Sequence, residues 1–285
     1  MKPSKKRYLA VALAAGLLLT GCSSGTGGGD SPDADCEPLA EFPTLTDGVL
    51  TIAAVNGMPK LEAEPGSGVA DGISGRNISS FADAMCLTRN WMPLAGAAAV
   101  ETMGSGRADI AAADWVRSAQ RGEVMGQSDT IWYEIPSITS REGYESISEL
   151  QGKTVGTTSG SGWIPALNAA LGESNVRTYD LAASAFADLL AGRIDAVYQS
   201  GSEASYRKQQ EGWEDVTVVL LAPEPDFPDL TTPFELNWPY TKSNTELGDA
   251  INLYIAQLRE DGTVERLLAE YGLTDPAFLT GTFDD

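Results

Sequence analysis

Two arginines four positions apart are the residues of this sequence that are best suited to binding an anion. Arg117 and Arg121 lie in the segment DWVRSAQRGEVM (114–125), in a chain with 19 basic and 40 acidic residues. A guanidinium offers a planar fork of N–H donors to a carboxylate and stays charged when it is buried. Two cations this close on a helical turn need a shared anion or separate partners. The alternative for Arg121 is a surface ion pair with an acid such as Glu123.

The sequence contains no histidine, which limits the catalytic chemistry that it supports. Ser-His-Asp and Cys-His catalysis and the usual zinc sites are excluded. Ser205 and Lys208 have the S-x-x-K spacing of a penicillin-binding nucleophile, but no Lys-Thr-Gly partner is present. We therefore expect no catalytic residues, no metal and no cofactor, and any proton transfer would fall to a Glu or Asp.

The N-terminus has the pattern of a segment that is removed after export. Basic residues between Lys2 and Arg7 precede the apolar run LAVALAAGLLLT, which predicts a signal peptide over residues 1–21. Its end, Leu19-Thr20-Gly21-Cys22, resembles the lipobox of bacterial lipoproteins, in which the cysteine receives a diacylglyceryl group and becomes the first residue. The alternative is an ordinary secretory signal with an incidental cysteine.

A lipid on Cys22, with further acylation such as palmitate, would hold the protein on the extracytoplasmic face of the cell membrane. Residues 22–36, rich in Gly, Ser and Asp, are expected to form a flexible tether. No later stretch has the length of apolar residues needed for a membrane span, so the lipid is the expected contact with the membrane.

The charge that remains after removal of residues 1–21 is strongly negative. Four of the 19 basic residues and no acidic residue lie in that segment, which leaves 15 against 40, a net charge of −25. Such a charge repels nucleic acid and anionic lipid head groups, so neither is an expected partner.

Two cysteines, Cys36 and Cys86, also remain after removal of the signal peptide and lipidation of Cys22. An even number of cysteines in an exported chain suggests one disulfide, and two free thiols are the alternative.

Apolar runs and helical patterns alternate along the rest of the chain, which indicates an α/β fold. Strands are expected at 49–55, 109–113, 154–157, 194–198 and 216–222, and helices around 78–85, 247–258 and 263–271. A Gly-Arg-x-Asp turn that leads into a strand occurs twice, ending at Asp109 and at Asp195. The repeat suggests two lobes of similar construction, with coincidence as the alternative.

The order of these motifs resembles that of the amino-acid-type (family 3) extracellular solute-binding proteins of bacterial ABC transporters. The resemblance covers residues 44 to 273 and rests on FPTLTDGVLTIAAV, GSGRADI, S-x-x-R before SDTIWYE, ISELQGKTVGTTSGSG, AGRIDAVY and NTELGDAINLYIAQLREDGTVERLLAEYGL. It implies the two-lobed periplasmic-binding-protein fold, with a two-stranded hinge and a ligand cleft between the lobes. Lobe 1 would comprise residues 37–138 plus 235–285, and lobe 2 residues 140–233.

The resemblance also implies which residues hold the ligand. Arg121 matches the arginine that clamps the ligand carboxylate, and Ser118 matches the hydroxyl beside it. Gly160 and Ser161 fall at a turn before a helix, where free N–H groups favour an anion. The aspartate that usually neutralises the α-ammonium falls at Ser200, beside Gln199, and both residues are neutral here. The implied ligand bears a carboxylate and is an amino acid or resembles one, but a standard α-ammonium lacks its usual partner.

Aromatic residues offer a second way to hold a cation. The resemblance brings Trp115, Trp132 and Trp163 near the cleft, where indole faces attract cations; packing in the core or at the rim is the alternative. The loop 56–64 lacks the aromatic residue that often stacks on the ligand in relatives. Arg117 has no match, so it has either a structural role or a second ligand contact.

Three functions remain open at this stage. The first is a monomeric carrier that delivers a small solute to an ABC permease, which the resemblance implies. The second is a ligand-sensing ectodomain that contacts a sensor. The third is a dehydratase-type enzyme on the same fold, with an added acid or base in the cleft.

Overall fold

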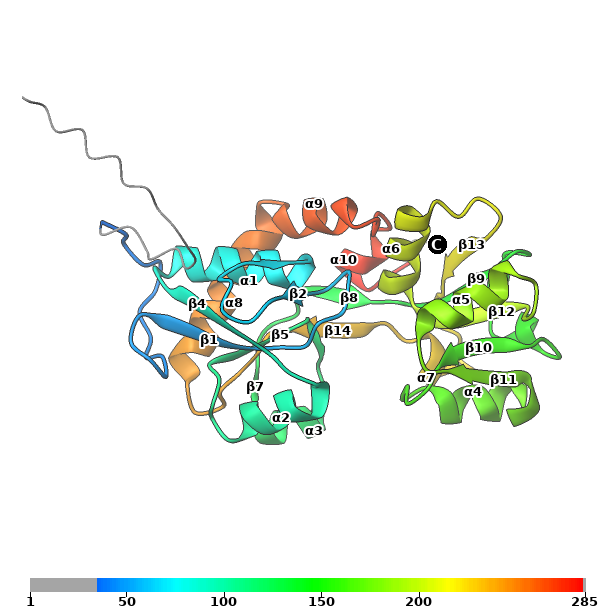
Figure 1. Ribbon diagram of the computed structural model, residues 1–285, viewed down its shortest axis with the longest axis horizontal. Helices are drawn as coiled ribbons and strands as arrows, with labels where there is room; N and C mark the ends of the chain where they lie inside the picture. Colours follow the sequence, from blue (N-terminus) through cyan, green and yellow to red (C-terminus); the bar gives the residue numbers. More distant parts are fainter. Residues whose placement is uncertain (1–34, 284–285) are drawn as a thin grey trace, which may run out of the picture.

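The protein consists of two α/β lobes that lie side by side and are joined by two extended strands (Figure 1). The structure is a computed structural model, and it describes residues 35–283. The predicted signal peptide and the lipidation of Cys22 lie outside these residues. Within them, no helix has the length and apolar character that a membrane crossing requires.

The first lobe is built on a five-stranded sheet in the order β4-β1-β5-β15-β7. The strand β1 runs parallel to β4 and to β5, whereas β15 is antiparallel to β5 and β7. The strands of this lobe are β1 (Val49–Ala54), β4 (Thr88–Pro93), β5 (Ile110–Ala112), β7 (Gly126–Gln127) and β15 (Pro239–Tyr240), with the hairpin β2 (Glu62–Ala63) and β3 (Ala70–Asp71). Its helices are α1 (Ile73–Ala84), α2 (Gly96–Gly104), α3 (Ala119–Val124), α8 (Thr245–Glu260), α9 (Thr263–Glu270) and α10 (Ala277–Thr280).

The second lobe is built on a sheet in the order β11-β10-β12-β9-β13. The strands β10, β11 and β12 are parallel, and β9 is antiparallel to both β12 and β13. Its strands are β9 (Pro136–Ser140), β10 (Val155–Thr158), β11 (Val176–Tyr179), β12 (Ala196–Ser200) and β13 (Thr217–Leu220). Its helices are α4 (Ile164–Leu171), α5 (Ala182–Leu190), α6 (Gly201–Glu211) and α7 (Pro228–Thr231), with short 3₁₀ helices at Ser148–Leu150 and Glu173–Asn175.

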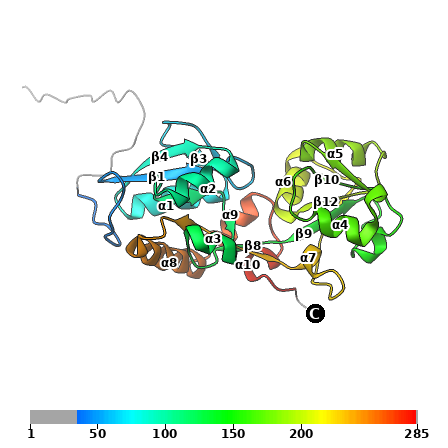
Figure 2. The same ribbon diagram turned by 90° about the horizontal axis from the view of Figure 1, so that it is seen from below.

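The two lobes are joined where β8 (Trp132–Glu134) pairs with β14 (Phe234–Asn237), beside β6 (Trp115–Val116). The chain leaves lobe 1 along β8, passes Ile135 and enters β9 of the second sheet, and it returns from α7 into β14. In both views these strands bridge the gap between the sheets (Figures 1 and 2). The boundary expected at residues 138–140 falls inside β9, whose five residues all pair with β12.

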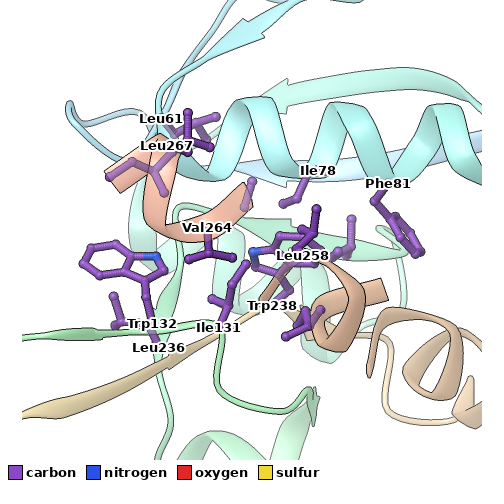
Figure 3. Packing of buried hydrophobic residues seen from close by; sticks show 14 of the residues in the cluster. Leu61, Ile78, Phe81, Ile131, Trp132, Leu236, Trp238, Leu258, Val264 and Leu267 are labelled. Atoms are coloured by element: carbon purple, nitrogen blue, oxygen red, sulfur yellow. The ribbon is translucent and has the colours of Figure 1, made fainter. Parts of the chain in front are cut away.

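The core of the first lobe lies between its sheet and the helices α1, α8 and α9 (Figure 3). The predicted C-terminal helices are confirmed: Leu247, Ile251 and Leu258 lie on the buried face of α8. Asn244 caps this helix by accepting a hydrogen bond from the Leu247 N–H at 3.1 Å. This buried face packs α8 and α9 against the strands of the lobe.

The repeated Gly-Arg-x-Asp turn has the same role in each lobe. The Asp109 carboxylate accepts the Thr51 N–H at 2.8 Å, and the Asp195 carboxylate accepts the Thr154 N–H at 2.7 Å. Each aspartate therefore ties the start of the strand that follows it to the neighbouring parallel strand, β1 or β10. Asp195 thus has a structural role in its turn.

The predicted disulfide is present between Cys36 and Cys86, with 5.8 Å between the Cα atoms. It ties the segment that precedes β1 to the end of α1. The alternative of two free thiols is therefore not the state of the chain in this structure.

Candidate ligand-binding cleft

A cavity of about 940 Å³ lies between the two lobes, beside the strands that join them. Lobe 1 contributes Lys60, Val116 and Arg121 to its wall, the joining strands contribute Glu134 and Phe234, and Pro136 lines it at the start of β9. Lobe 2 contributes the residues at the carboxyl ends of its parallel strands β10, β11 and β12. Ligands of open α/β sheets characteristically bind at such strand ends. We call this cavity the interlobe cleft.

Arg121 enters the interlobe cleft from α3. Its guanidinium lies over the Trp115 indole, with Cζ 5.1 Å from the ring centroid, and Nη1 donates a hydrogen bond to the Val116 carbonyl at 2.5 Å. No carboxylate of residues 35–283 pairs with it, so the alternative of an ion pair with Glu123 does not occur. Burial lowers the pKa of this guanidinium from its ordinary value, because desolvation disfavours the charged form. The remaining donors are free for an anion in the cleft.

Ser118 and Trp115 position Arg121 and do not line the cavity. The Ser118 hydroxyl caps α3 by accepting the Arg121 N–H at 3.2 Å, and its own N–H donates to the Gln127 side chain at 2.9 Å. Trp115 is 8% exposed, and its indole N–H donates to the Ala112 carbonyl at 2.9 Å. Trp115 therefore packs against the guanidinium of Arg121 without lining the cleft.

Arg117 has a structural role on the joining strands. Its Nη1 donates to the Ser128 carbonyl at 2.7 Å, and its Nε lies 3.4 Å from a Glu235 carboxylate oxygen. The backbone N–H of Arg117 also donates to the Glu235 carbonyl, in the pairing of β6 with β14. Of the two outcomes left open for Arg117, these contacts match the structural one.

The turn before α4 supplies Ser161 and Trp163 to the cleft wall, while Gly160 lies on the exposed side of that turn. The Trp163 indole N–H donates to the Thr157 hydroxyl at 2.7 Å, and its ring meets Tyr198 edge-on with 5.6 Å between the centroids. These contacts fix one edge of Trp163 and leave the indole half-buried in the cleft wall.

Gln199 and Ser200 line the cleft at the end of β12. Gln199 is 5% exposed, and its amide is used within the lobe: Nε2 donates to the Thr158 hydroxyl at 2.8 Å, and Oε1 accepts the Ser200 N–H at 3.3 Å. The two neutral residues at this strand end are thus held by contacts within lobe 2.

Trp132 is fully buried in the first-lobe core and does not line the interlobe cleft. Its indole N–H and that of Trp238 donate to the two oxygens of the buried Asp114 carboxylate, each at 2.8 Å. Desolvation raises the pKa of Asp114, and the two indole donors oppose that shift. The alternative of core packing therefore holds for Trp132.

A polar junction at the base of the cleft was not expected from the sequence. The Glu134 carboxylate pairs with the Lys60 ammonium at 2.8 Å and accepts hydrogen bonds from the Ser202 N–H at 3.0 Å and the Ser202 hydroxyl at 2.5 Å. Lys60 belongs to the first lobe, Glu134 to a joining strand and Ser202 to α6 of the second lobe. No sequence pattern predicts that these three residues meet. The one related observation is that Lys60 belongs to the loop 56–64, which has a lysine but no aromatic residue.

The charges of the cleft wall divide into paired and unpaired groups. Lys60 pairs with Glu134, and Arg207 pairs with Glu203 at 3.0 Å. Within the described part of the chain, Arg121 has no ionic partner, and neither do the exposed Asp180 and Asp229. No group of three potential metal ligands occurs among residues 35–283. The cleft wall therefore contains unpaired charges of both signs.

Comparison with known proteins places this geometry in a family. Residues 50–274 match the model of the bacterial extracellular solute-binding proteins, family 3, whereas no curated protein matches significantly. An ancestral cationic amino acid solute-binding protein has a similar structure, with a TM-score of 0.68 at 20% identity over 79% of this chain and 96% of that one.

Two further solved structures show the same fold. Substrate-binding domain 2 of GlnP from Lactococcus lactis, in its open conformation, has a TM-score of 0.62 at 20% identity over 81% of this chain and 99% of that one. A putative ABC transporter binding component from Wolinella succinogenes, complexed with lysine, has a TM-score of 0.65 at 18% identity over 80% and 97%. Because the family model matches residues 50–274, which are most of this chain, the chain belongs to the family 3 bacterial extracellular solute-binding proteins.

Proposed function

We propose that this protein is a lipid-anchored carrier that captures a small carboxylate-bearing solute outside the cytoplasm and delivers it to an ABC permease. The ligand is an amino acid or a compound that resembles one. Its carboxylate pairs with Arg121, and the two lobes close around it by rotation of the joining strands. Capture requires only that ligand contacts from both lobes favour the closed state.

The observation that carries the proposal is the unpaired Arg121 guanidinium in the interlobe cleft. The other two cations of the cleft wall, Lys60 and Arg207, are neutralised by Glu134 and Glu203. Arg121 is half-buried, supported by Trp115 and without a carboxylate partner among residues 35–283. A desolvated cation without a partner is costly, and an incoming carboxylate that offers two oxygens relieves that cost.

The delivery step rests on the family and on the N-terminal sequence. Family membership supports a partnership with an ABC permease. The Leu19-Thr20-Gly21-Cys22 motif supports a lipid on Cys22, which would keep the carrier at the membrane, close to that permease. Mass spectrometry of the protein from its native membrane tests this part: a diacylglyceryl group on an N-terminal Cys22 supports it, and an unmodified cysteine contradicts it.

The binding step is tested by a thermal-shift screen of amino acids, betaines, ectoines and small organic acids. A ligand that binds only the folded state raises the melting temperature. We expect carboxylates to raise it in the wild-type protein and in Arg107→Ala, which removes an exposed cation paired with Glu101, but not in Arg121→Ala. Hits without a carboxylate, or hits that Arg121→Ala retains, would contradict the assignment.

We further propose that the protein does not transform its ligand. The dehydratase alternative requires turnover, so incubation of the purified protein with each hit, followed by mass spectrometry, separates an enzyme from a carrier. The sensing alternative is tested by uptake of a labelled hit into cells that lack the gene, where loss of uptake supports transport.

A further inference from the structure

The carboxylate of Asp180 lies at the same edge of the second sheet as Gln199, but two strands away. Asp180 directly follows β11, which is parallel to β10 with Tyr179 opposite Thr158. The Ser159 N–H donates to the Tyr179 carbonyl at 2.8 Å, so the backbone beside Asp180 is held against the turn that follows β10. On the other side of Thr158 lies Gln199, whose Nε2 donates to the Thr158 hydroxyl. The order along the edge is therefore Asp180, Thr158, Gln199.

Asp180 lines the interlobe cleft together with Arg121, and its carboxylate is uncommitted. In the part of the chain that the structure describes, it makes no hydrogen bond and no ion pair. Asp188, only eight residues further on, is by contrast paired with Arg193 and Arg177 on the surface of the lobe. Gln199, at the end of β12, is neutral and has both amide atoms engaged.

Closure of the cleft makes an unpaired carboxylate expensive, because it removes water from a charge that has no partner. A cationic group on the ligand removes this cost, as the carboxylate of the ligand does for Arg121. The residues next to Asp180 are apolar: Leu181 is 66% exposed and lines the cleft with Ala182 and Ala183. The wall around this acid thus suits the aliphatic part of a ligand beside a charged end.

We propose that Asp180 is a specificity-determining residue that binds a cationic group at the end of the ligand remote from its carboxylate. The inference rests on the proposed function, since it takes the carboxylate of the ligand to be held by Arg121. Neighbouring strands of a sheet lie about 4.8 Å apart, so Asp180 is about 10 Å along the edge from Ser200. A cation bound there is about two strands away from Ser200, the position at which the resemblance places the partner of an α-ammonium, so it belongs to a group several bonds beyond the α-carbon. The ligand class is a distal-cation carboxylate, such as an ω-ammonium or ω-quaternary acid.

Asp229 is the rival acid for this assignment, and its variant shows which of the two acids of the cleft wall holds the cation. It also lines the cleft, is exposed and has no ionic partner among residues 35–283. Asp229 lies in the first turn of α7, however, and not at the end of a parallel strand. Its substitution removes the same charge from the same cavity, but from a helix and not from the end of a strand.

The test compares pairs of carboxylates that differ in one cationic group, titrated by calorimetry into wild type, Asp180→Asn, Asp229→Asn and Arg121→Ala. ε-Aminocaproate and caproate differ in a distal ammonium, whereas alanine and propionate differ in an α-ammonium. We expect the wild type and Asp229→Asn to bind ε-aminocaproate about tenfold more tightly than caproate. Asp180→Asn should bind the two equally and keep the affinity for caproate.

The outcomes separate this inference from the proposed function. Binding of caproate that Arg121→Ala abolishes, with no preference for ε-aminocaproate, would overturn the role of Asp180 and leave the carboxylate clamp standing. A preference for ε-aminocaproate that survives Asp180→Asn, or a wild type that prefers alanine over propionate as strongly as it prefers ε-aminocaproate over caproate, would also overturn it. Carboxylate binding that does not depend on Arg121 would instead overturn the proposed function, and the inference with it.

Discussion

The guanidinium of Arg121 rests on the indole of Trp115, with 5.1 Å between Cζ and the ring centroid. The tryptophan is held in turn by its N–H hydrogen bond to Ala112, so the orientation of the cation is set by the first-lobe core. Pre-organisation of this kind reduces the entropy that ligand binding has to overcome.

Substitution of Trp115 should therefore weaken binding although the residue does not line the cleft. We expect Trp115→Leu to reduce affinity for the carboxylate ligand by about 1 kcal/mol, because the cation loses an aromatic face. Trp115→Phe keeps a face and should lose less. Calorimetry on both variants checks this prediction, and equal affinities for Trp115→Leu and the wild type would argue against a supporting role.

The Lys60–Glu134–Ser202 junction should contribute to stability. The Glu134 side chain is 7% exposed, and its removal leaves a partly buried ammonium without its partner. We expect Glu134→Ala to lower the free energy of unfolding by about 3 kcal/mol, and Glu134→Gln, whose single amide oxygen still accepts one of the two hydrogen bonds from Ser202, to lower it less. Urea denaturation measures both, and a loss under about 0.5 kcal/mol for the alanine variant would contradict the prediction.

The disulfide should stabilise the first lobe by restricting the unfolded chain. Cys36 and Cys86 are separated by 50 residues, and the loss of a cross-link of this kind typically costs about 2–4 kcal/mol. We expect a double Cys→Ser variant to unfold at lower urea concentration than the wild type without reductant. Under non-reducing conditions, intact mass after alkylation should show neither cysteine modified; modification of both would contradict the bond.

The buried Asp114 should make stability depend on pH in a direction opposite to that of a salt-bridged acid. Desolvation raises its pKa in the folded state above the ordinary 3.8, so the folded state holds more protons than the unfolded state between these two values. The contribution of Asp114 to the free energy of unfolding is therefore fully present below pH 3.8 and is lost as pH rises through the folded pKa.

Asp114→Asn removes this titration, and the comparison isolates it from the other carboxylates. At low pH the protonated Asp114 and the amide are both neutral and similar in shape beside the indoles of Trp132 and Trp238, so the two proteins should be of similar stability. As pH rises through the folded pKa of Asp114, the wild type should lose stability relative to the variant, which does not titrate there. A wild type that gains stability relative to the variant as pH rises would show that the folded pKa of Asp114 is lowered.

The fold was largely predictable because its strands and helices carry periodic patterns. The buried face of α8 recurs at helical spacing, Asn244 supplies its cap, and the two Gly-Arg-x-Asp turns predict equivalent strand starts at Asp109 and Asp195. Each of these features depends on residues that are close in sequence.

The cleft wall was less predictable because it depends on strand order and on local backbone turns. Ala113 and Asp114 have φ values of 101° and 48°, and this left-handed turn between β5 and β6 places Trp115 beneath Arg121 and not in the cleft. Asp180 reaches the ligand-facing edge only because β11 lies next to β10, and no periodicity in the sequence reports that order. Lys60 and Glu134 meet across 74 residues of sequence.

The central claim is that Arg121 binds the carboxylate of the ligand, and calorimetry with the tightest carboxylate ligand tests it most directly. We expect Arg121→Ala to weaken binding by about 2–4 kcal/mol, Arg121→Lys to recover part of that loss, and Arg107→Ala to match the wild type. Affinity in Arg121→Ala that equals that of Arg107→Ala would contradict the account.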